Sequence, residues 1–160
     1  VNVNISATQL ENHGFRAAVV DILHRTKFPP EYFCIELTER CKNMDIAFLR
    51  NELDYFRKLG IKIAMDDFGT GNATLNLLTE LPIDELKVDM SFVKGIQQSK
   101  PNQVLVQAVV SCAHELGYKS CIEGVEDKEL FDYLHRYGST YYQGYHFSKP
   151  VTLDDFMKLL

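Results

Sequence analysis

The sequence has no long hydrophobic run, no basic stretch and no charged-then-apolar leader. Since a membrane-spanning helix needs roughly 18 or more consecutive apolar residues, we expect neither a membrane segment nor a signal peptide in it. A formal net charge of -5 argues against a protein that binds nucleic-acid polymers through a basic stripe. We therefore expect a cytoplasmic domain, either free or as the cytoplasmic part of a membrane-anchored protein.

Paired cysteine motifs are absent as well. The sequence has four cysteines, and no two of them form a C-x-x-C pair. Cys34, Cys112 and Cys121 stand among apolar residues, where reduced buried thiols are common. A chain of 160 residues with 46% hydrophobic content can bury a core without disulfides. These features predict one domain with reduced cysteines, as is usual in the cytoplasm.

Strand patterns and helix patterns alternate along the chain. We expect strands at 1–6, 33–39, 61–67, 85–89, 119–124 and 140–143. The expected helices follow at about 7–27, 46–56, 75–78, 103–116, 127–137 and from 153 onward. A series of six strand-then-helix units predicts parallel strands covered by helices.

Two architectures accommodate such units: a doubly wound open sheet and a (β/α)₈ barrel. The strands favour the barrel, because aliphatic and polar residues alternate in them; Leu86 and Val88, for example, flank Lys87. An open sheet covered by helices on both sides would be apolar on both faces. We therefore predict an α/β fold, a TIM-type (β/α)₈ barrel of which this chain covers about six units. Its active site would lie at the carboxyl ends of the strands.

The stretch at 63–71 combines an apolar strand with two adjacent aspartates and a loop that contains glycines. Asp66 and Asp67 end the strand, and Gly69 and Gly71 follow. Adjacent carboxylates repel each other, so cations bound between them would offset the charge. A carboxylate that bridges two metal ions suits phosphoester hydrolysis. The alternative is a solvated strand end that merely begins a turn.

Polar residues share one face near the carboxyl ends of the expected strands. They are Asn4, Glu36, Asp66, Lys87, Glu123 and Gln143, with Asp67 and Glu126 just beyond in loops. Carboxylate and amide oxygens suit Mg²⁺ or Mn²⁺, and none of the five histidines belongs to this set, which disfavours zinc. Each residue alone has an ordinary structural explanation, but their shared face predicts a metal-dependent site.

Over essentially all 160 residues, the chain resembles a known family, the EAL domain of cyclic-di-GMP signalling proteins. The matching motifs are Asn4-Ile5-Ser6, Glu36-Leu37-Thr38-Glu39, Asp66-Asp67-Phe68-Gly69-Thr70-Gly71, Leu86-Lys87-Val88-Asp89, Glu123-Gly124-Val125-Glu126 and Gln143-Gly144-Tyr145. The Glu-Ala-Leu motif that names the family is absent, so we expect residues 1–160 to be the C-terminal three quarters of the domain, without its first strands. The loop also departs from the family after Gly71, because Asn72-Ala73-Thr74-Leu75 stands where an aromatic residue and serines are more usual.

The resemblance implies a cyclic-di-GMP phosphodiesterase that forms linear pGpG with two Mg²⁺ or Mn²⁺ ions and so lowers the level of this bacterial second messenger. It implies metal ligands at Asn4, Glu36, Asp66, Asp67 and Glu123, with Asp66 bridging. It implies catalytic roles for Lys87, Glu123 and Asp67, in which Lys87 positions the attacking water and Glu123 holds the second metal or acts as base. Gln143 and Asp89 would support the site or the substrate. The residues implied to organise the loop are Glu39, Phe68, Gly69, Thr70, Gly71 and Glu126.

The competing interpretation is a degenerate module that binds cyclic di-GMP or a protein without hydrolysis. This chain keeps every site motif that falls within its boundaries, which favours the enzyme. The resemblance also implies a homodimer and a fused sensory or diguanylate-cyclase-type domain. We expect the 160 residues alone to be inactive, because one metal ligand is missing.

Overall fold

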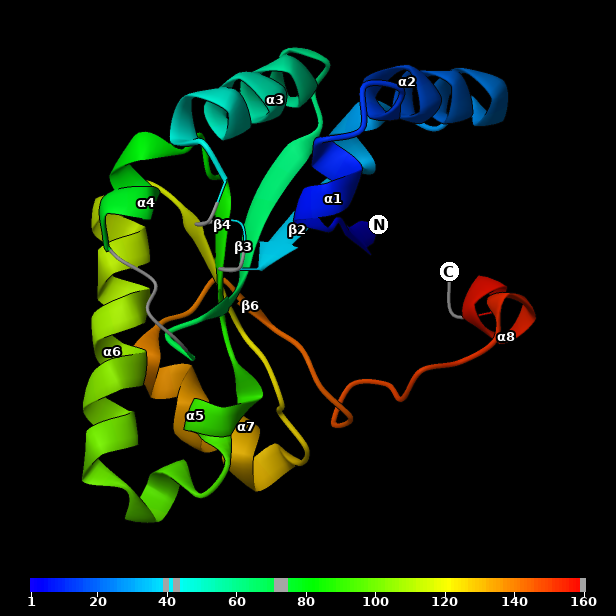
Figure 1. Cartoon of the computed structure of the whole chain (residues 1–160). Helices are drawn as coiled ribbons and strands as arrows, with labels where there is room; N and C mark the ends of the chain where they lie inside the picture. The colour runs from blue at the N-terminus through cyan, green and yellow to red at the C-terminus, as the bar shows by residue number, and fades with distance from the viewer. Residues whose placement is uncertain (39–40, 42–43, 71–74, 159–160) are drawn as a thin grey trace.

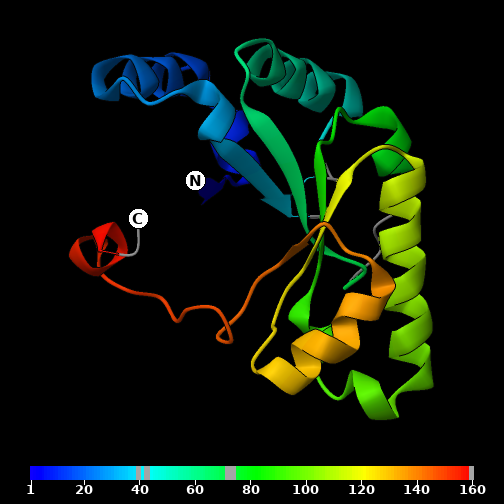
Figure 2. The same cartoon turned by 180° about the vertical axis from the view of Figure 1, so that it is seen from behind.

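The computed structural model describes residues 1–38, 41, 44–70 and 75–158. Its centre is a sheet of six parallel strands in the order β1-β2-β3-β4-β5-β6, so that each strand pairs with the next along the chain. The strands are β1 (Asn2–Asn4), β2 (Cys34–Thr38), β3 (Lys62–Phe68), β4 (Glu85–Val88), β5 (Lys119–Ile122) and β6 (Tyr141–Tyr142). The sheet curls into part of a barrel (Figures 1 and 2), which confirms the predicted TIM-type arrangement.

Most helices connect the strands and lie outside the curved sheet, whereas α8 follows the last strand and stands apart from the sheet (Figure 1). The α-helices are α1 (Ala7–Leu10), α2 (Phe15–Thr26), α3 (Ile46–Lys58), α4 (Leu75–Glu80), α5 (Met90–Val93), α6 (Lys100–Glu115), α7 (Lys128–Leu134) and α8 (Leu153–Met157). Short 3₁₀ helices are η1 (Pro30–Tyr32), η3 (Ile96–Gln98) and η4 (His135–Tyr137). In the described ranges, no helix has both the length and the apolar character that a membrane span requires.

The helix expected over 7–27 is two helices in the structure. Ser6 begins α1 through a capping box with Gln9. The side chain of Asn12 then accepts a hydrogen bond from the N–H of Gly14 (2.8 Å), which holds the chain in a turn before α2. Local hydrogen bonding by an asparagine therefore interrupts an apolar pattern that predicts one continuous helix.

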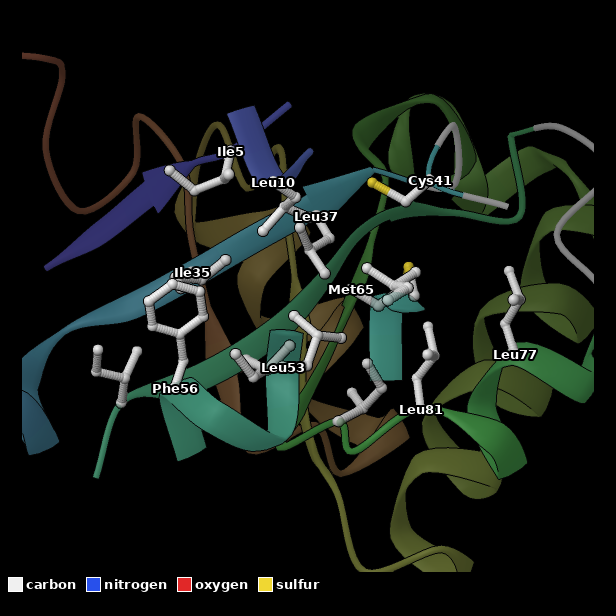
Figure 3. Close-up of a cluster of buried hydrophobic side chains, with 14 of the residues drawn as sticks. Ile5, Leu10, Ile35, Leu37, Cys41, Leu53, Phe56, Met65, Leu77 and Leu81 are labelled. Carbon is white, nitrogen blue, oxygen red and sulfur yellow. The ribbon is translucent and has the colours of Figure 1, made fainter. Parts of the chain in front are cut away.

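The outward face of the sheet carries aliphatic side chains that pack against the helices. Ile35, Leu37 and Met65 are almost completely buried there, together with Leu53 and Phe56 of α3 (Figure 3). Burial of each such side chain contributes roughly 1.5–3 kcal/mol. Because successive strand residues point to opposite faces, this outward packing directs the polar residues between them to the inner face.

The inner face is accessible from the open side of the curved sheet. β1 and β6 are its two edge strands, and each pairs with a single neighbouring strand. A cavity of about 550 Å³ lies between them, and residues of both edges line it, including Asn2, Cys34, Cys121 and Tyr142. Polar and ionisable side chains such as Asn2 and Glu85 therefore share this part of the interior with aromatic side chains such as Phe33.

Candidate active site

A β-bulge in β3 places two aspartates beside one lysine. The pairing of β3 with β4 shifts between Met65 and Phe68. Asp66 and Asp67 therefore face the single residue Lys87. Asp67 has a left-handed backbone conformation (φ 53°), which aspartate tolerates better than most residues do. Asp67 belongs to β3, in agreement with the strand expected at 61–67, so its placement just beyond the strand in a loop is wrong. The bulge keeps its carboxylate near that of Asp66.

Lys87 is the centre of a buried network of ion pairs. Its Nζ lies 2.6 Å from Glu36 Oε1, 2.7 Å from Glu123 Oε1 and 3.1 Å from Asp66 Oδ1. Burial by itself lowers the pKa of Lys87, but hydrogen bonds to Glu123 and Glu36 outweigh burial and raise this pKa above its ordinary value. Lys87 is therefore a stable cation at neutral pH, held by carboxylates from β2, from β3 and from the residue after β5.

Two carboxyl groups of the site have raised pKa values. Burial raises the pKa of Glu123, although the nearby Lys87 opposes this shift. Burial also raises the pKa of Asp67, and the negative charges of Asp66 and Asp89 add to the effect. Asp89 caps α5 by accepting a hydrogen bond from the N–H of Ser91 (2.9 Å). The cluster thus holds more negative charge than Lys87 neutralises, which favours a further cation.

Asp66, Asp67 and Glu123 form a cluster that can hold a metal ion. One carboxylate oxygen of each lies within 4.8 Å of the others. Asp66 Oδ1 is buried and accepts no hydrogen bond from any described residue, and its 3.1 Å contact with Lys87 Nζ is an ion pair without hydrogen-bond geometry. A buried carboxylate oxygen without a hydrogen bond is stabilised by a bound cation. The donor set of three carboxylates therefore fits a hard divalent cation.

The first strand contributes Asn2 to this network instead of Asn4. Asn2 Nδ2 donates a hydrogen bond to Glu36 Oε1 (2.9 Å), the oxygen that also contacts Lys87. Asn4 is the strand partner of Glu36, but its side chain is exposed and has no hydrogen bond to a described residue. Alternation along the strand puts both asparagines on one face, so the sequence offers no basis for choosing Asn2.

The residues that follow the aspartates pack on α5. Phe68 is buried, and Thr70 Oγ1 donates a hydrogen bond to the carbonyl oxygen of Asp67 (3.0 Å). Gly69 has φ 97°, and a Cβ at this position would lie 3.1 Å from the ring of Phe92. Glycine therefore allows this segment to approach α5 closely. Phe92 lies outside the motifs that we singled out in the sequence, and its aromatic ring alone offered no signal of this contact.

Gln143 and Glu126 lie on the β5–β6 side of the cluster. Together with Glu123 they line a cavity of about 210 Å³. Both side chains are exposed, and Glu126 forms no hydrogen bond or ion pair with a described residue. The structure thus brings Gln143 and Glu126 to the border of the site. Two further residues predicted to organise the loop, Glu39 and Gly71, lie outside the described residues.

Gly144 allows the chain after β6 to pass directly over Val125. A Cβ on Gly144 would lie 2.1 Å from the carbonyl oxygen of Val125, so no other residue fits there without movement of the backbone. The N–H of Val125 donates to the carbonyl oxygen of Gln143 (3.0 Å), and the N–H of His146 donates to that of Val125 (2.9 Å). This close contact holds Gln143 beside Glu123.

Comparisons with known proteins agree with this arrangement. The model of the EAL domain family matches residues 1–150. Cyclic di-GMP phosphodiesterase PdeR of Escherichia coli (strain K12) is 35% identical over 151 residues, which are 94% of this chain and 23% of PdeR. This chain spans about a fifth of the length of the curated relatives that it matches.

Solved structures are similar over nearly the whole chain. The EAL domain of Mycobacterium smegmatis DcpA superposes with a TM-score of 0.93 at 35% identity, covering 99% of this chain and 71% of that one. BlrP1 of Klebsiella pneumoniae, in a manganese/cy-diGMP complex, superposes with a TM-score of 0.85 at 33% identity, covering 93% of this chain and 38% of that one. The family model, the fold and the acidic cluster at the strand ends lead to one conclusion: the chain belongs to the EAL domain family.

Proposed function

We propose that this chain carries the catalytic centre of a phosphodiesterase that hydrolyses cyclic di-GMP to linear pGpG and so lowers the level of this second messenger in bacteria. The observation that carries the proposal is the meeting of Asp66, Asp67 and Glu123, with oxygens within 4.8 Å of one another, beside the buried Lys87. Relatives with names such as cyclic di-GMP phosphodiesterase support the same activity.

The proposed cation is Mg²⁺ or Mn²⁺. Asp66, Asp67 and Glu123 would hold one ion, while Asn4 and Glu36 are the proposed ligands of a second. When bound, these cations neutralise the phosphodiester and lower the pKa of a bound water. The oxygen-only donor set and the buried Oδ1 of Asp66 support this assignment. The manganese complex of BlrP1 supports it as well.

The residues of this chain would perform the remaining chemistry. Lys87 is proposed to orient the attacking water and to stabilise negative charge that develops on the phosphate oxygens. Glu123 Oε1 would accept a proton from the water as its oxygen bonds to phosphorus. The bond from phosphorus to the 3′-oxygen then breaks, and that oxygen takes up a proton from solvent. The raised pKa of Glu123 suits a base that works near neutral pH.

The residues around the cluster are proposed to position it and the substrate. Asp89 lies against Asp67 and caps α5, which supports a role in holding that carboxylate. The place of Gln143 on the cavity beside Glu123 supports a role in binding the substrate. The residues proposed to organise the segment that follows the two aspartates are Glu39, Phe68, Gly69, Thr70, Gly71 and Glu126.

An assay of the full-length protein tests this function. With Mg²⁺ or Mn²⁺ we expect cyclic di-GMP to be converted to pGpG, and no conversion in excess chelator. An Asp66→Asn variant should lose turnover, whereas Asp54→Asn should keep it, because Asp54 is a partly exposed residue of α3 that pairs with Arg50. Tight binding of cyclic di-GMP without any cleavage by the wild-type protein would instead support a non-catalytic binding module.

We also propose that the active protein is a homodimer with a fused sensory or diguanylate-cyclase-type domain and that it works in the cytoplasm. The greater length of the curated relatives is compatible with further domains. Analytical ultracentrifugation of the full-length protein would reveal the oligomeric state.

A further inference from the structure

The ammonium group of Lys87 and the candidate cation site use the same oxygens. Asp66 and Glu123 belong to the cluster that can hold a metal ion, and both contact Lys87 Nζ, at 3.1 Å and 2.7 Å. We propose that Lys87 is a built-in competitor of the divalent cation, which binds only as the ammonium group releases Asp66 and Glu123. This inference rests on the metal site of the proposed function.

The confined position of Lys87 explains why its ammonium group and a divalent metal ion would exclude each other. Its side chain is 4% exposed and contacts carboxylates from β2, from β3 and from the residue after β5. Two cations in a buried site repel each other strongly, because little water screens them. A carboxylate oxygen that accepts a short contact from an ammonium group is also less available to a metal ion. Removal of the lysine charge should therefore strengthen metal binding.

After Lys87 releases Asp66 and Glu123, Glu36 remains as its partner. Glu36 Oε1 lies 2.6 Å from Nζ and lies outside the cluster of Asp66, Asp67 and Glu123, so an ion held by that cluster does not compete for Glu36. The contact with Asp66 is the weakest of the three, since Asp66 Oδ1 accepts no hydrogen bond from a described residue. A small rotation of the lysine side chain can thus free two carboxylates while it keeps Glu36. The released ammonium group can then approach an anionic phosphate, so its positive charge reaches the substrate after the cation is in place.

Calorimetric titration of the full-length protein with Mn²⁺ tests the competition. We expect Lys87→Met to bind Mn²⁺ about tenfold more tightly than the wild type. The matched control is Lys62→Met, which removes an exposed lysine of β3 that lies 4.0 Å from Asp84. It should leave the affinity unchanged. Equal or weaker binding by Lys87→Met would overturn the proposal, because it would show that the lysine supports the metal ion or is indifferent to it.

A measurement on the wild-type protein avoids dependence on the fold of the variant. The buried ammonium group of Lys87 should give a slowly exchanging ¹H–¹⁵N signal in chelator, and Mg²⁺ should shift or broaden it as the ion pairs break. A signal that stays unchanged while Mg²⁺ binds would overturn the proposal. The proposed function fails separately: a wild-type protein that binds neither Mg²⁺ nor Mn²⁺ would disprove the metal site itself.

Discussion

Lys87 Nζ lies 2.6 Å from Glu36 Oε1, although 51 residues separate the two in the sequence. Both side chains are almost fully shielded from water, and Asn2 donates a second hydrogen bond to the same oxygen of Glu36. A buried ion pair of this kind contributes little net stability by itself. The loss of one partner is nevertheless destabilising, because it leaves the other charge buried without that partner. Glu36 therefore connects β1, β2 and β4 through its hydrogen bonds, and it also holds Lys87 in the candidate active site.

The first prediction concerns stability. Glu36→Gln should lower the free energy of unfolding by about 2 kcal/mol at neutral pH, which is less than the loss of an entire buried pair, because Lys87 keeps Asp66 and Glu123. Urea denaturation of the full-length protein measures the change. Glu115→Gln, which alters an exposed carboxylate at the end of α6, is the control and should be neutral. Equal stability of the two variants would show that the Lys87–Glu36 pair contributes nothing.

The second prediction concerns the metal ligands. Asp66→Asn should abolish divalent-metal-dependent cleavage and weaken metal binding, because it removes the charge of a buried oxygen that has no hydrogen bond. Calorimetry and a nucleotide assay check both effects. Near-normal turnover of this variant would refute the assignment of Asp66 to the metal site. Asp21→Asn, on the exposed surface of α2, is the matched control.

The third prediction separates chemistry from binding. Lys87→Ala and Glu123→Gln should each lower kcat by about 100-fold or more, with a much smaller change in KM. Their proposed partners are the attacking water and charge that develops in the transition state, and the ground-state substrate makes little use of either. Steady-state kinetics at saturating Mn²⁺ gives both constants. If a variant raised only KM, the role that we assign to the substituted residue would be wrong.

The fourth prediction compares two glycines. Gly138→Ala should cost about 1 kcal/mol, because Gly138 has φ 70° but no atom lies within 4 Å of the added Cβ. Gly144→Ala should cost about 3 kcal/mol or more, since its Cβ would overlap backbone atoms of Val125, which cannot rotate away. It should also lower activity by displacing Gln143. Thermal unfolding of both variants measures the difference, and equal costs would contradict the close contact.

The fifth prediction concerns the thiols. Burial, with a smaller effect of nearby carboxylates such as Glu85, raises the pKa of Cys34 and of Cys121 to about 12. The reactive thiolate is therefore scarce at both positions at pH 8, while Cys112 is only partly buried. Iodoacetamide followed by mass spectrometry should modify Cys112 first, and unfolding in urea should expose the rest. Modification of Cys34 as fast as Cys112 would contradict the burial of the Cys34 thiol and its raised pKa.

Much of the site could be predicted from local patterns. Alternation in β4 puts Lys87 on the face opposite Leu86 and Val88, and burial of the aliphatic residues fixes which face that is. The same rule directs Glu36 and Asp66 inward. Their carboxylates, and the lack of histidine among the inward residues, specify an oxygen site for a hard cation. These properties depend only on residue type and on the two-residue period of a strand.

Which side chains contact each other in the site depends on how neighbouring strands of the sheet pair. The bulge that carries Asp67 arises from the pairing of β3 with β4, and it reverses the face that simple alternation assigns to that residue. The choice of Asn2 over Asn4 follows from the direction of the Glu36 side chain. A register shift of one residue would change each of these contacts, and the two-residue alternation of a strand does not by itself locate a bulge. The sequence therefore identified which chemical groups meet, and the packing of the strands settled which atoms bind each other.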